Sequence, residues 1–386
     1  MKLCGFCSAS KGIAPLHARV LDKDGIEKCV PIYDGPCSIC NDKALETTRM
    51  IDDACKMLPD GGTFSISTII PSDWLIREEE IWDRVLANSQ SIKNYLNHHI
   101  SNMIEKGKNA CYVSDGDYRV IFDYASGKVE STRNELFVFG RYKKLSQGLS
   151  QSRWRCTRCE GKGCQECQGK GKLYVSVEEK VGEPFKKAAL ADDYVMHASG
   201  REDVDATNTA GRAFVMEIKN PKNRRFDLAL IASEIAQSGE VSVDDLRIVP
   251  RTFLELVTES HFDKTYDAYV EFGREVSATD GEKIASLEGK TLLQQTPKRV
   301  AHRRANLVRH RKIKEINASG FTGKHCNISV KAEAGTYIKE LISGDGGRTK
   351  PSISELLGTT AVCKKLEVTE IDDGYMEFCL EKMKKI

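Results

Sequence analysis

The sequence lacks the features that would place it in a membrane, and it carries little net charge. No apolar run approaches the ~20 residues that a membrane-spanning helix needs, and the N-terminal stretch MKLCGFCSAS has no apolar core of a signal peptide. We therefore expect a cytoplasmic protein without a membrane partner. The formal net charge is only +2 over 386 residues, so overall charge does not indicate a nucleic-acid partner.

Nucleotide-binding glycine motifs are also missing. The stretch GDGGRTKPS at 344–352 has the glycines of a phosphate loop, but their spacing is not that of a Walker motif. No GxGxxG sequence follows a convincing strand. These absences argue against a nucleotide hydrolase or a dinucleotide-dependent enzyme, and we expect no nucleotide cofactor.

Cysteine, in contrast, is abundant, with 14 residues in a composition that is otherwise typical of a globular protein. In the cytosol thiols stay reduced, so paired CxxC motifs indicate metal ligands or redox centres rather than disulfides. Two groups of four are candidate ligands: Cys4, Cys7, Cys37 and Cys40, and Cys156, Cys159, Cys164 and Cys167. Four thiolates satisfy a closed tetrahedral zinc site, which is structural rather than catalytic. We therefore expect one or two structural zinc ions.

The second group, CTRCEGKGCQECQGKGK at 156–172, allows other interpretations. Its CxxCxGxG unit resembles the cysteine-rich repeats of DnaJ-type chaperones, but those come in fours with a J domain, and no His-Pro-Asp occurs here. A redox centre needs a single cysteine of low pKa, and the spacing differs from the ferredoxin iron–sulfur pattern. Zinc is the interpretation that we favour.

Periodicity predicts an α+β protein. Residues 41–60 have a helical period that ends at Pro-Asp-Gly-Gly, a strand follows, and one long helix is expected from Ser72 to about residue 108. Alternating segments near residues 111–146 predict strands. The sequence thus predicts an N-terminal α/β module over residues 1–150, a connector with the cysteine knot over 151–172, and a mixed α and β domain over 173–386.

One basic segment stands out from the balanced composition. The stretch from Gln294 to Lys314 has eight Lys or Arg residues, no acid, and apolar residues among the charges. A solvated basic face is the ordinary interpretation of such a run. The alternation favours a strand or turn that presents cations to nucleic-acid phosphates.

A polar loop precedes an apolar strand in HASGREDVDATNTAGRAFVMEIK, residues 197–219. Three acids and two arginines crowd this loop. In an arbitrary protein such charges would simply pair with one another at the surface. The alternative is a catalytic carboxylate beside a phosphate-binding arginine.

Several of these strings, in this order, resemble the Pus ten family of tRNA pseudouridine synthases. They are SGREDVDA with GRAFVMEI, DKTYDAYV, QTPKRVAHRR and AGTYIKELISGDGGRTKPSI, which together span residues 197–357. The connector FGRYKKLSQGLSQSRW is also similar to the family's. The cysteine knot is typical of archaeal members. The resemblance implies a catalytic domain of pseudouridine-synthase type with a mixed, mostly antiparallel sheet, preceded by a zinc-stapled THUMP module that binds RNA.

The resemblance also implies roles for individual residues. Asp203 matches the family's catalytic aspartate, which attacks the sugar as a nucleophile or removes a sugar proton. Lys339 takes the place of the basic residue that pairs with that aspartate, in a motif like the Gly-Thr-Tyr-Ile-Arg of the bacterial T-loop uridine synthase. Tyr266 and Tyr337 are expected to bind the flipped uridine. Predicted RNA contacts are Arg201, Arg299, His302, Arg303 and Arg304.

The implied substrate is tRNA, modified at uridines 54 and 55 of the T arm by a monomeric enzyme that needs no cofactor for catalysis. Three other functions compete with this interpretation. A tRNA-binding or tRNA-folding protein of the same fold would keep the surface without the reaction. An RNA methyltransferase would need a glycine loop for S-adenosylmethionine, and a zinc deaminase would need His-x-Glu; the sequence contains neither. The segment ATNTAGRAF departs from the family pattern and could shift the choice of position.

Overall fold

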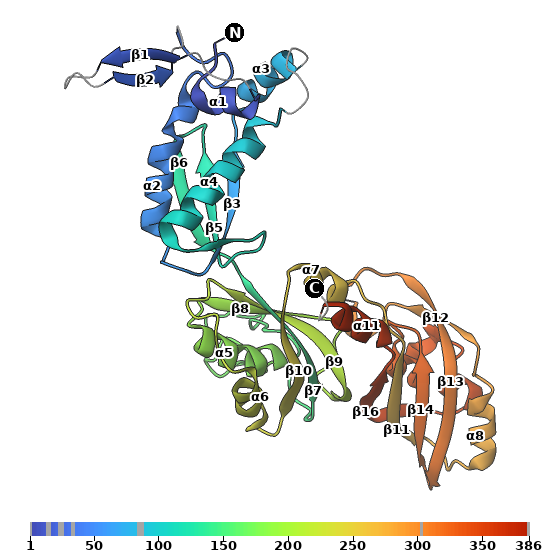
Figure 1. The fold of residues 1–386 in the computed structure, drawn as a ribbon. Coiled ribbons are helices and arrows are strands. Elements are labelled where there is room, and N and C mark those ends of the chain that lie inside the picture. Colours follow the sequence, from blue (N-terminus) through green and yellow to red (C-terminus); the bar gives the residue numbers. More distant parts are fainter. Residues whose placement is uncertain are drawn as a thin grey trace. The chain divides into compact units, whose positions relative to one another are not determined.

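A computed structural model describes residues 2–12, 17–21, 27–31, 35–82, 89–301 and 304–383. The chain forms two compact units, Met1–Glu135 and Leu136–Ile386 (Figure 1). Each unit has its own buried core, so each is described by itself.

The first unit is an α/β structure around a four-stranded sheet. Its elements are α1 (Gly5–Ser10), β1 (His17–Leu21), β2 (Glu27–Pro31), a 3₁₀ turn η1 (Lys43–Glu46), α2 (Thr47–Met57), β3 (Thr63–Ile69), α3 (Ser72–Trp82), α4 (Ile92–Lys108), β4 (Cys111–Tyr112), β5 (Tyr118–Asp123) and β6 (Lys128–Arg133). The sheet has the order β4-β3-β5-β6. Helices α2 and α4 contribute apolar residues to the same core as β3 and β5.

The long helix expected from residue 72 onward is two helices. The second, α4, begins after Ser91, whose side chain accepts a hydrogen bond from the backbone N–H of Asn94 at 3.1 Å. Serine at this position satisfies one of the otherwise unpaired N–H groups of a helix start. The polar stretch before Ile92 therefore precedes a second helix with its own apolar stripe. Periodicity alone did not predict this break.

The second unit is built on a ten-stranded sheet with helices on its faces. Its elements are β7 (Leu136–Lys144), α5 (Val177–Ala189), β8 (Asp193–Ala198), β9 (Ala206–Lys219), α6 (Leu228–Ala236), β10 (Val241–Val249), α7 (Thr252–Thr258), β11 (Lys264–Phe272), α8 (Ala278–Ala285), β12 (Thr291–Gln295), η2 (Lys298–Val300), β13 (Val308–Thr322), β14 (His325–Ala332), α9 (Ile338–Ser343), η3 (Gly344–Gly347), β15 (Thr349–Lys350), α10 (Ile353–Leu357), β16 (Ala361–Ile371) and α11 (Gly374–Met383).

The sheet runs β10-β7-β9-β16-β11-β14-β13-β12-β15, and β8 also pairs with β9. Among the described strands of this sheet, the pairing of β16 with β9 is parallel and the other neighbours are antiparallel. The parallel contact is short, joining Leu366–Val368 to Ala206–Asn208. The expectation of an α+β fold with a mixed, mostly antiparallel sheet is confirmed.

The sequence assigned residues 1–150 to the N-terminal module, but β7 (Leu136–Lys144) belongs to the second unit. Its register pairs it with β9 on one side and β10 on the other, inside the second unit. The pattern of ELFVFGRYKKL identifies a strand. Within it Val138, Phe139 and Tyr142 are buried, Phe139 on the face opposite to the other two. The pattern cannot identify the partner strands, which lie more than 60 residues further along the chain.

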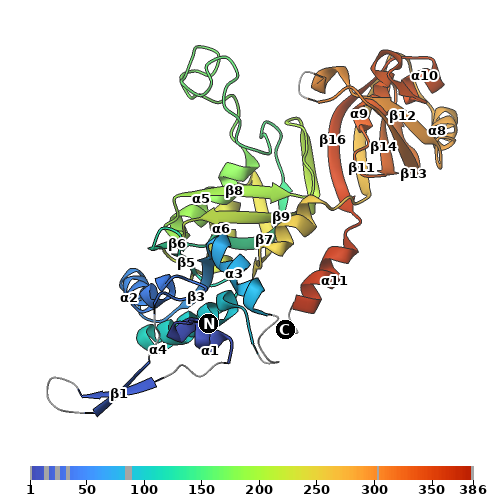
Figure 2. The ribbon, with the colours of Figure 1, turned by 90° about the horizontal axis from the view of Figure 1, so that it is seen from above.

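Helices cover the sheet in three groups. Helices α5 and α6 pack with β7, β8, β9 and β10 around one core, and α7 and α11 pack on the opposite face of β7 and β9. Helices α8, α9 and α10 join β11, β13, β14 and β16 in another core. Figure 2 shows the two halves of this sheet from above, with the segment between β7 and α5 extending away from the strands.

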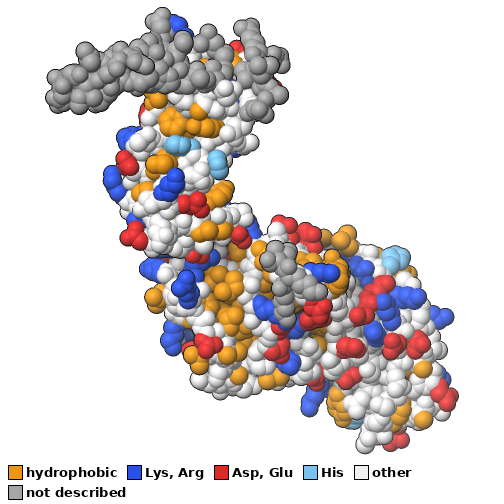
Figure 3. Space-filling model, viewed as in Figure 1, with side chains coloured by type: hydrophobic (Ala, Val, Ile, Leu, Met, Phe, Trp, Pro, Cys, Tyr) orange, Lys and Arg blue, Asp and Glu red, His pale blue; other side chains and the backbone are white. Residues whose placement is uncertain are grey.

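The surface is charged but mixed in sign. In Figure 3, Lys and Arg side chains are interspersed with Asp and Glu over the face drawn, in keeping with the net charge of +2. In the part of the chain that the structure describes, no helix combines the length and the apolar character needed to cross a membrane.

Candidate active site

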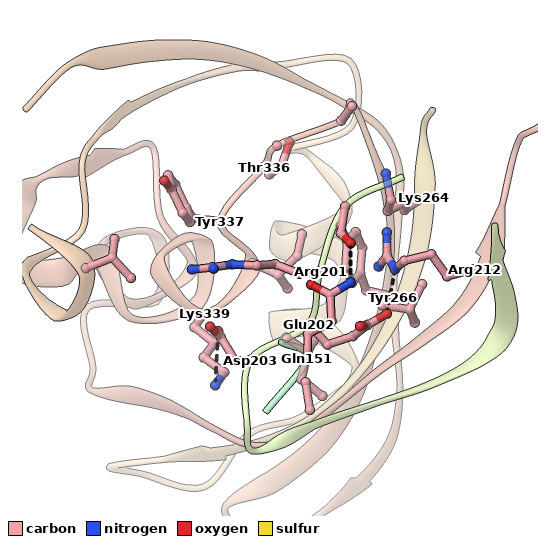
Figure 4. Close-up of a pocket in the computed structure, with 18 of the residues that line it drawn as sticks. Gln151, Arg201, Glu202, Asp203, Arg212, Lys264, Tyr266, Thr336, Tyr337 and Lys339 are labelled. Carbon is pink, nitrogen blue, oxygen red and sulfur yellow. Dashed lines mark hydrogen bonds and ion pairs between the residues drawn. The ribbon is translucent and has the colours of Figure 1, made fainter. Parts of the chain in front are cut away.

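A cavity of about 580 Å³ opens where the two halves of the second unit's sheet join. Its wall is formed by the loop between β8 and β9, by residues of β11 and η2, and by the start of α9 (Figure 4). Cations outnumber acids among the lining residues. The cavity therefore has the sign of charge that attracts a polyanion.

Asp203 lies in the loop between β8 and β9, with its side chain about 29% exposed. Lys144 of β7 holds this loop in place: its Nζ donates to the carbonyl oxygens of Asp203 at 2.8 Å and Val204 at 3.0 Å. Gln151 donates to the carbonyl of Gly200 at 2.8 Å. The carboxylate is thus fixed in place and still reachable from the cavity.

Two cations flank the Asp203 carboxylate. Arg299 of η2 donates to Asp203 Oδ2 at 2.6 Å, and it also binds Glu340 at 2.7 Å. Lys339 Nζ is 3.6 Å from Asp203 Oδ2 and 2.5 Å from Asp205 Oδ1. The structure therefore brings Lys339 to Asp203, as expected, but the shorter contact comes from Arg299, which we had expected to bind RNA.

These ion pairs fix the charges around the loop. Partial burial of Asp205 opposes ionisation, but the hydrogen bond from Lys339 outweighs it and holds the pKa of Asp205 below its usual range. Burial likewise opposes the charge of Arg299, and its bonds to Glu340 and Asp203 raise its pKa overall. The ion pairs of Asp205 and Arg299 therefore favour the charged form of these two side chains.

A buried network supports the loop from beneath. Glu202, one residue before Asp203, accepts from Arg212 Nε at 2.7 Å and from the Tyr142 hydroxyl at 2.7 Å. Arg212 also donates to the carbonyl of Ser199 at 3.3 Å. Gly200 has φ of +128°, and a Cβ there would lie 2.7 Å from Arg212 Nη1. Only glycine allows the backbone to approach the guanidinium this closely.

Breaking this network should destabilise the second unit. In Arg212→Met the Glu202 carboxylate stays buried without its cation, which we expect to lower the free energy of unfolding by about 3–5 kcal/mol. Adding Glu202→Gln removes the stranded charge and should recover part of the loss. Urea denaturation followed by circular dichroism measures both. A double variant as unstable as Arg212→Met alone would show that the charge pair is not the cause.

Tyr266 lines the cavity from β11, beside the same network. Burial raises the pKa of its phenol to about 12, with Arg212 acting in the opposite direction. Lys264, two residues earlier on the same strand, also lines the cavity. Burial and the nearby Arg212 lower the pKa of Lys264 to about 8. At neutral pH the tyrosine is a neutral hydroxyl with an aromatic face, and the lysine is charged.

The other expected site residues fall into two groups. Tyr337 lines the cavity, with Arg299 and Arg309 near its ring at 6.0 and 5.8 Å. It directly precedes the first turn of α9, which contains Lys339, so the start of this helix places both residues at the cavity. Arg201 and Arg304 also line the cavity. His302 and Arg303 lie outside the described residues.

Sequence reasoning missed the residues that support the loop. Lys144, Tyr142 and Gln151 stand in a segment that the sequence assigns to a strand and a connector. Nothing in the sequence indicates that they bond to Asp203, Glu202 and Gly200, respectively. Arg212 does carry a signal, because it directly precedes the apolar run AFVMEI. A charge beside a buried apolar run needs a buried partner.

The first group of cysteines lies in the core of the first unit. Cys4, Cys7, Cys37 and Cys40 are buried, and their four sulfur atoms lie within 4.8 Å of one another. Cys4 and Cys40 Sγ are 3.5 Å apart. A tetrahedral zinc ion with Zn–S bonds of ~2.3 Å separates its sulfurs by ~3.8 Å. This cluster could therefore hold a metal ion of that kind.

The second group lies between β7 and α5, in the second unit. Its closest sulfur separations are 3.7 and 3.8 Å, again near the zinc tetrahedron. The N–H groups of Gly163 and Gly171 donate to Cys159 and Cys167 sulfurs at 3.2 Å. Both glycines have positive φ, and a Cβ on Gly171 would lie 2.4 Å from the Gly161 carbonyl. The Gly-x-Gly steps thus let the two CxxC turns pack against each other.

The cavity presents a fixed, reachable carboxylate, two cations beside it, and a neutral phenol, within walls that attract phosphate. These groups can act on the bond between a sugar and its base in a nucleic acid without a redox step. This is the chemistry of the pseudouridine synthases.

Comparison with known sequences agrees. The family model described as "Pus10, C-terminal" matches residues 137–372, and the chain belongs to this family. A relative from Korarchaeum cryptofilum, named tRNA pseudouridine synthase Pus10, is 36% identical over 87% of this chain and 93% of its own.

Two further relatives carry the same name. That from Methanothermobacter marburgensis is 37% identical over 90% of this chain and 89% of its own. That from Methanothrix thermoacetophila is 36% identical over 80% of this chain and 69% of its own. A crystal structure of a Cbf5–Nop10–Gar1 complex aligns with 48% of this chain and 43% of that chain, at 18% identity and a TM-score of 0.31. The assignment to the family rests on the family model and the relatives.

Proposed function

We propose that this protein is a tRNA pseudouridine synthase that converts uridines 54 and 55 of the T arm to pseudouridine. The observation that carries the proposal is the position of Asp203, ion-paired with Arg299 in a cationic cavity. Membership of the Pus10 family supports it, since the curated relatives are named for this reaction. The T-arm positions follow from the resemblance of the motifs around Asp203 and Lys339.

The reaction is an isomerisation, so atoms and electrons balance without a co-reactant. The N1–C1′ bond breaks, the uracil turns, and C5 bonds to C1′; the proton lost from C5 is balanced by one gained at N1. Asp203 is assigned to the sugar, either attacking C1′ or removing a sugar proton. Arg299 and Lys339 hold the carboxylate in position, at 2.6 and 3.6 Å.

The remaining cavity residues are assigned to the nucleotide. Tyr266 gives the flipped uracil an aromatic face and a hydroxyl for moving the C5 proton. Tyr337 lines the uridine pocket, and Arg201 and Arg304 bind the phosphates that hold the nucleotide out of its stack. For the first unit we propose a THUMP-type role in binding tRNA, as a module that spans the described strands β3–β6. The reaction belongs in the cytoplasm, where tRNA is used.

We also assign zinc to both cysteine clusters, on the basis of their sulfur separations and closed sets of four thiolates. The ions are structural in this proposal. A closed site leaves no coordination position for substrate, and neither set of cysteines lines the cavity.

The test is an assay of an unmodified tRNA transcript with purified protein and no added cofactor, with pseudouridine mapped position by position. Product at 54 and 55 is expected. Product at other positions would overturn the assigned specificity, and no product on any tRNA that the protein binds tightly would overturn the proposed reaction.

Tyr266 supplies a finer prediction. Tyr266→Phe keeps the aromatic face and removes the hydroxyl, so we expect single-turnover rates to fall by about 10- to 100-fold with tRNA affinity unchanged. Because the pKa of Tyr266 is about 12, ionisation of this phenol should not alter the wild-type rate below about pH 11. A wild-type rate that follows a titration near pH 10 and loses it in Tyr266→Phe would contradict this assignment.

A further inference from the structure

Trp154 stands exposed at the edge of the cavity. Trp154 is 44% exposed, whereas Trp74, in the core of the first unit, is 1% exposed. Trp154 precedes the first cysteine of the second cluster by two positions. An exposed indole is a large apolar surface left in water, and it is more often found where a partner covers it.

The main chain on both sides of Trp154 is anchored. On one side, the Arg153 backbone N–H donates to Glu178 at 2.9 Å, and its guanidinium binds Asp193 at 2.9 Å and lies 4.2 Å from the ring centre of Tyr194. On the other side, the N–H of Cys156 donates to the Gly171 carbonyl at 2.7 Å, inside the cysteine cluster. The main chain that carries the exposed indole is therefore held on both sides.

Three arginines surround the indole. The Arg201 guanidinium lies 5.2 Å from its ring centre. A hollow of about 540 Å³ is lined by Trp154, Arg201, Arg304, Ala305 and Arg309, without an acid among these residues. The three arginines also line the main cavity. The hollow and the cavity thus share a wall, and a chain of phosphates could pass from one to the other.

We propose that Trp154 is a stacking platform for an unpaired base of the RNA substrate, next to the nucleotide whose uracil occupies the cavity. Arg201, Arg304 and Arg309 bind the phosphates that flank this base. The cysteine cluster serves the reaction by holding Trp154 in position. The proposal rests on the proposed function and assigns a second nucleotide subsite to it.

The chemistry of the hollow identifies its occupant. Arginines without acids select a polyanion, and a flat exposed aromatic ring selects the face of a base. Sequence-tolerant RNA binding combines these two elements, because every base has a face on which to stack. An acidic peptide would satisfy the arginines but would leave the indole exposed.

The test measures affinity for a hairpin RNA carrying the T-arm sequence. Asp203→Asn serves as the background, so that no product forms during the titration. Trp154→Ala should weaken binding by about tenfold or more, the usual scale of one lost stack. Trp154→Phe should recover most of the affinity, and Trp154→Leu should not, because volume without an aromatic face cannot stack. Tyr174→Ala is the matched control, since Tyr174 is 45% exposed in the same connector and does not line the hollow.

The base is located by replacing each nucleotide beside the target with an abasic one. At one position the abasic RNA should bind the Asp203→Asn protein about as weakly as intact RNA binds the Trp154→Ala variant. Combining the abasic nucleotide with Trp154→Ala should weaken binding no further than either change alone. Equal affinity of Trp154→Ala and its background, or full recovery by Trp154→Leu, would overturn the proposal. So would additive losses at every flanking position.

The role of the cluster is tested in the same titration. Replacing Cys159 and Cys167 with serine should weaken binding to the level of Trp154→Ala, and adding Trp154→Ala should change nothing further. Additive losses would overturn this part. Failure of the proposed function is distinguishable, because it appears as absence of pseudouridine with the unaltered protein, whatever the affinity of the Trp154 variants.

Discussion

Replacing Asp203 with alanine should abolish pseudouridine formation while leaving tRNA binding intact. Removal of a positioned carboxylate that acts on the sugar should slow the single-turnover rate by at least about 10³-fold. Asp203 is about 29% exposed and paired with Arg299 at the cavity wall, so the change does not strand a deeply buried charge. Mapping of pseudouridine in a tRNA transcript, with a parallel binding titration, measures both effects.

Asp203→Asn refines this experiment because it keeps the size of the side chain. It can still accept a hydrogen bond from Arg299, but it cannot serve as nucleophile or base. We expect it to be as inactive as Asp203→Ala. An active Asp203→Asn would mean that the residue orients the loop and that another group does the chemistry.

Asp205 is the matched control two residues further on. It is the other carboxylate near Lys339, at 2.5 Å, but its side chain is 68% exposed. Asp205→Ala frees Lys339 to turn towards Asp203, so we expect a loss of no more than about tenfold, from less exact positioning of the loop. An inactive Asp205→Ala beside an active Asp203→Ala would reverse the assignment.

The sequence predicted the main residues of the cavity but not the ion-pair partner of Asp203. Asp203, Lys339, Tyr266 and Tyr337 were expected from motifs, and all four line one cavity. The sequence did not assign Arg299 to Asp203, because 96 residues separate them and their contact arises only when η2 folds over the cavity. The basic run around Arg299 predicted phosphate contacts, and local spacing does not distinguish that role from a structural ion pair.

The fold has the same limit. Sequence patterns identified β7 and β9 as strands, and both prove to be buried on both faces. Pairing was not predictable: the parallel contact between β16 and β9 joins segments about 160 residues apart. The helix after Tyr337 was not predicted either; there Ile338, Leu341 and Ile342 share a buried helical stripe. A helix of six residues is too short to separate from strand alternation before its partners are known.

Loss of the zinc ion that we assign to the N-terminal cluster should unfold much of the first unit and leave the second folded. Cys4, Cys7, Cys37 and Cys40 belong to the same core as Ile92, Leu96 and Ile100 of α4. They join the chain terminus to residues 37–40, across 30 or so intervening residues. Structural zinc contributes on the order of 10 kcal/mol in small domains, which is comparable with the whole stability of a typical domain.

Without an ion, the four buried thiols would be left in contact only with one another's sulfurs as ligands. We expect hydrogen exchange of the α2 and α4 amides to rise by at least about a hundredfold after Cys37→Ser with Cys40→Ser, with exchange in β9 and β11 unchanged. Cys111→Ser is the control, because Cys111 is an exposed thiol of the same unit, outside both clusters. Retained protection in α4 after proven loss of the metal would mean that the apolar core alone stabilises this unit, and that the cluster has a task other than folding.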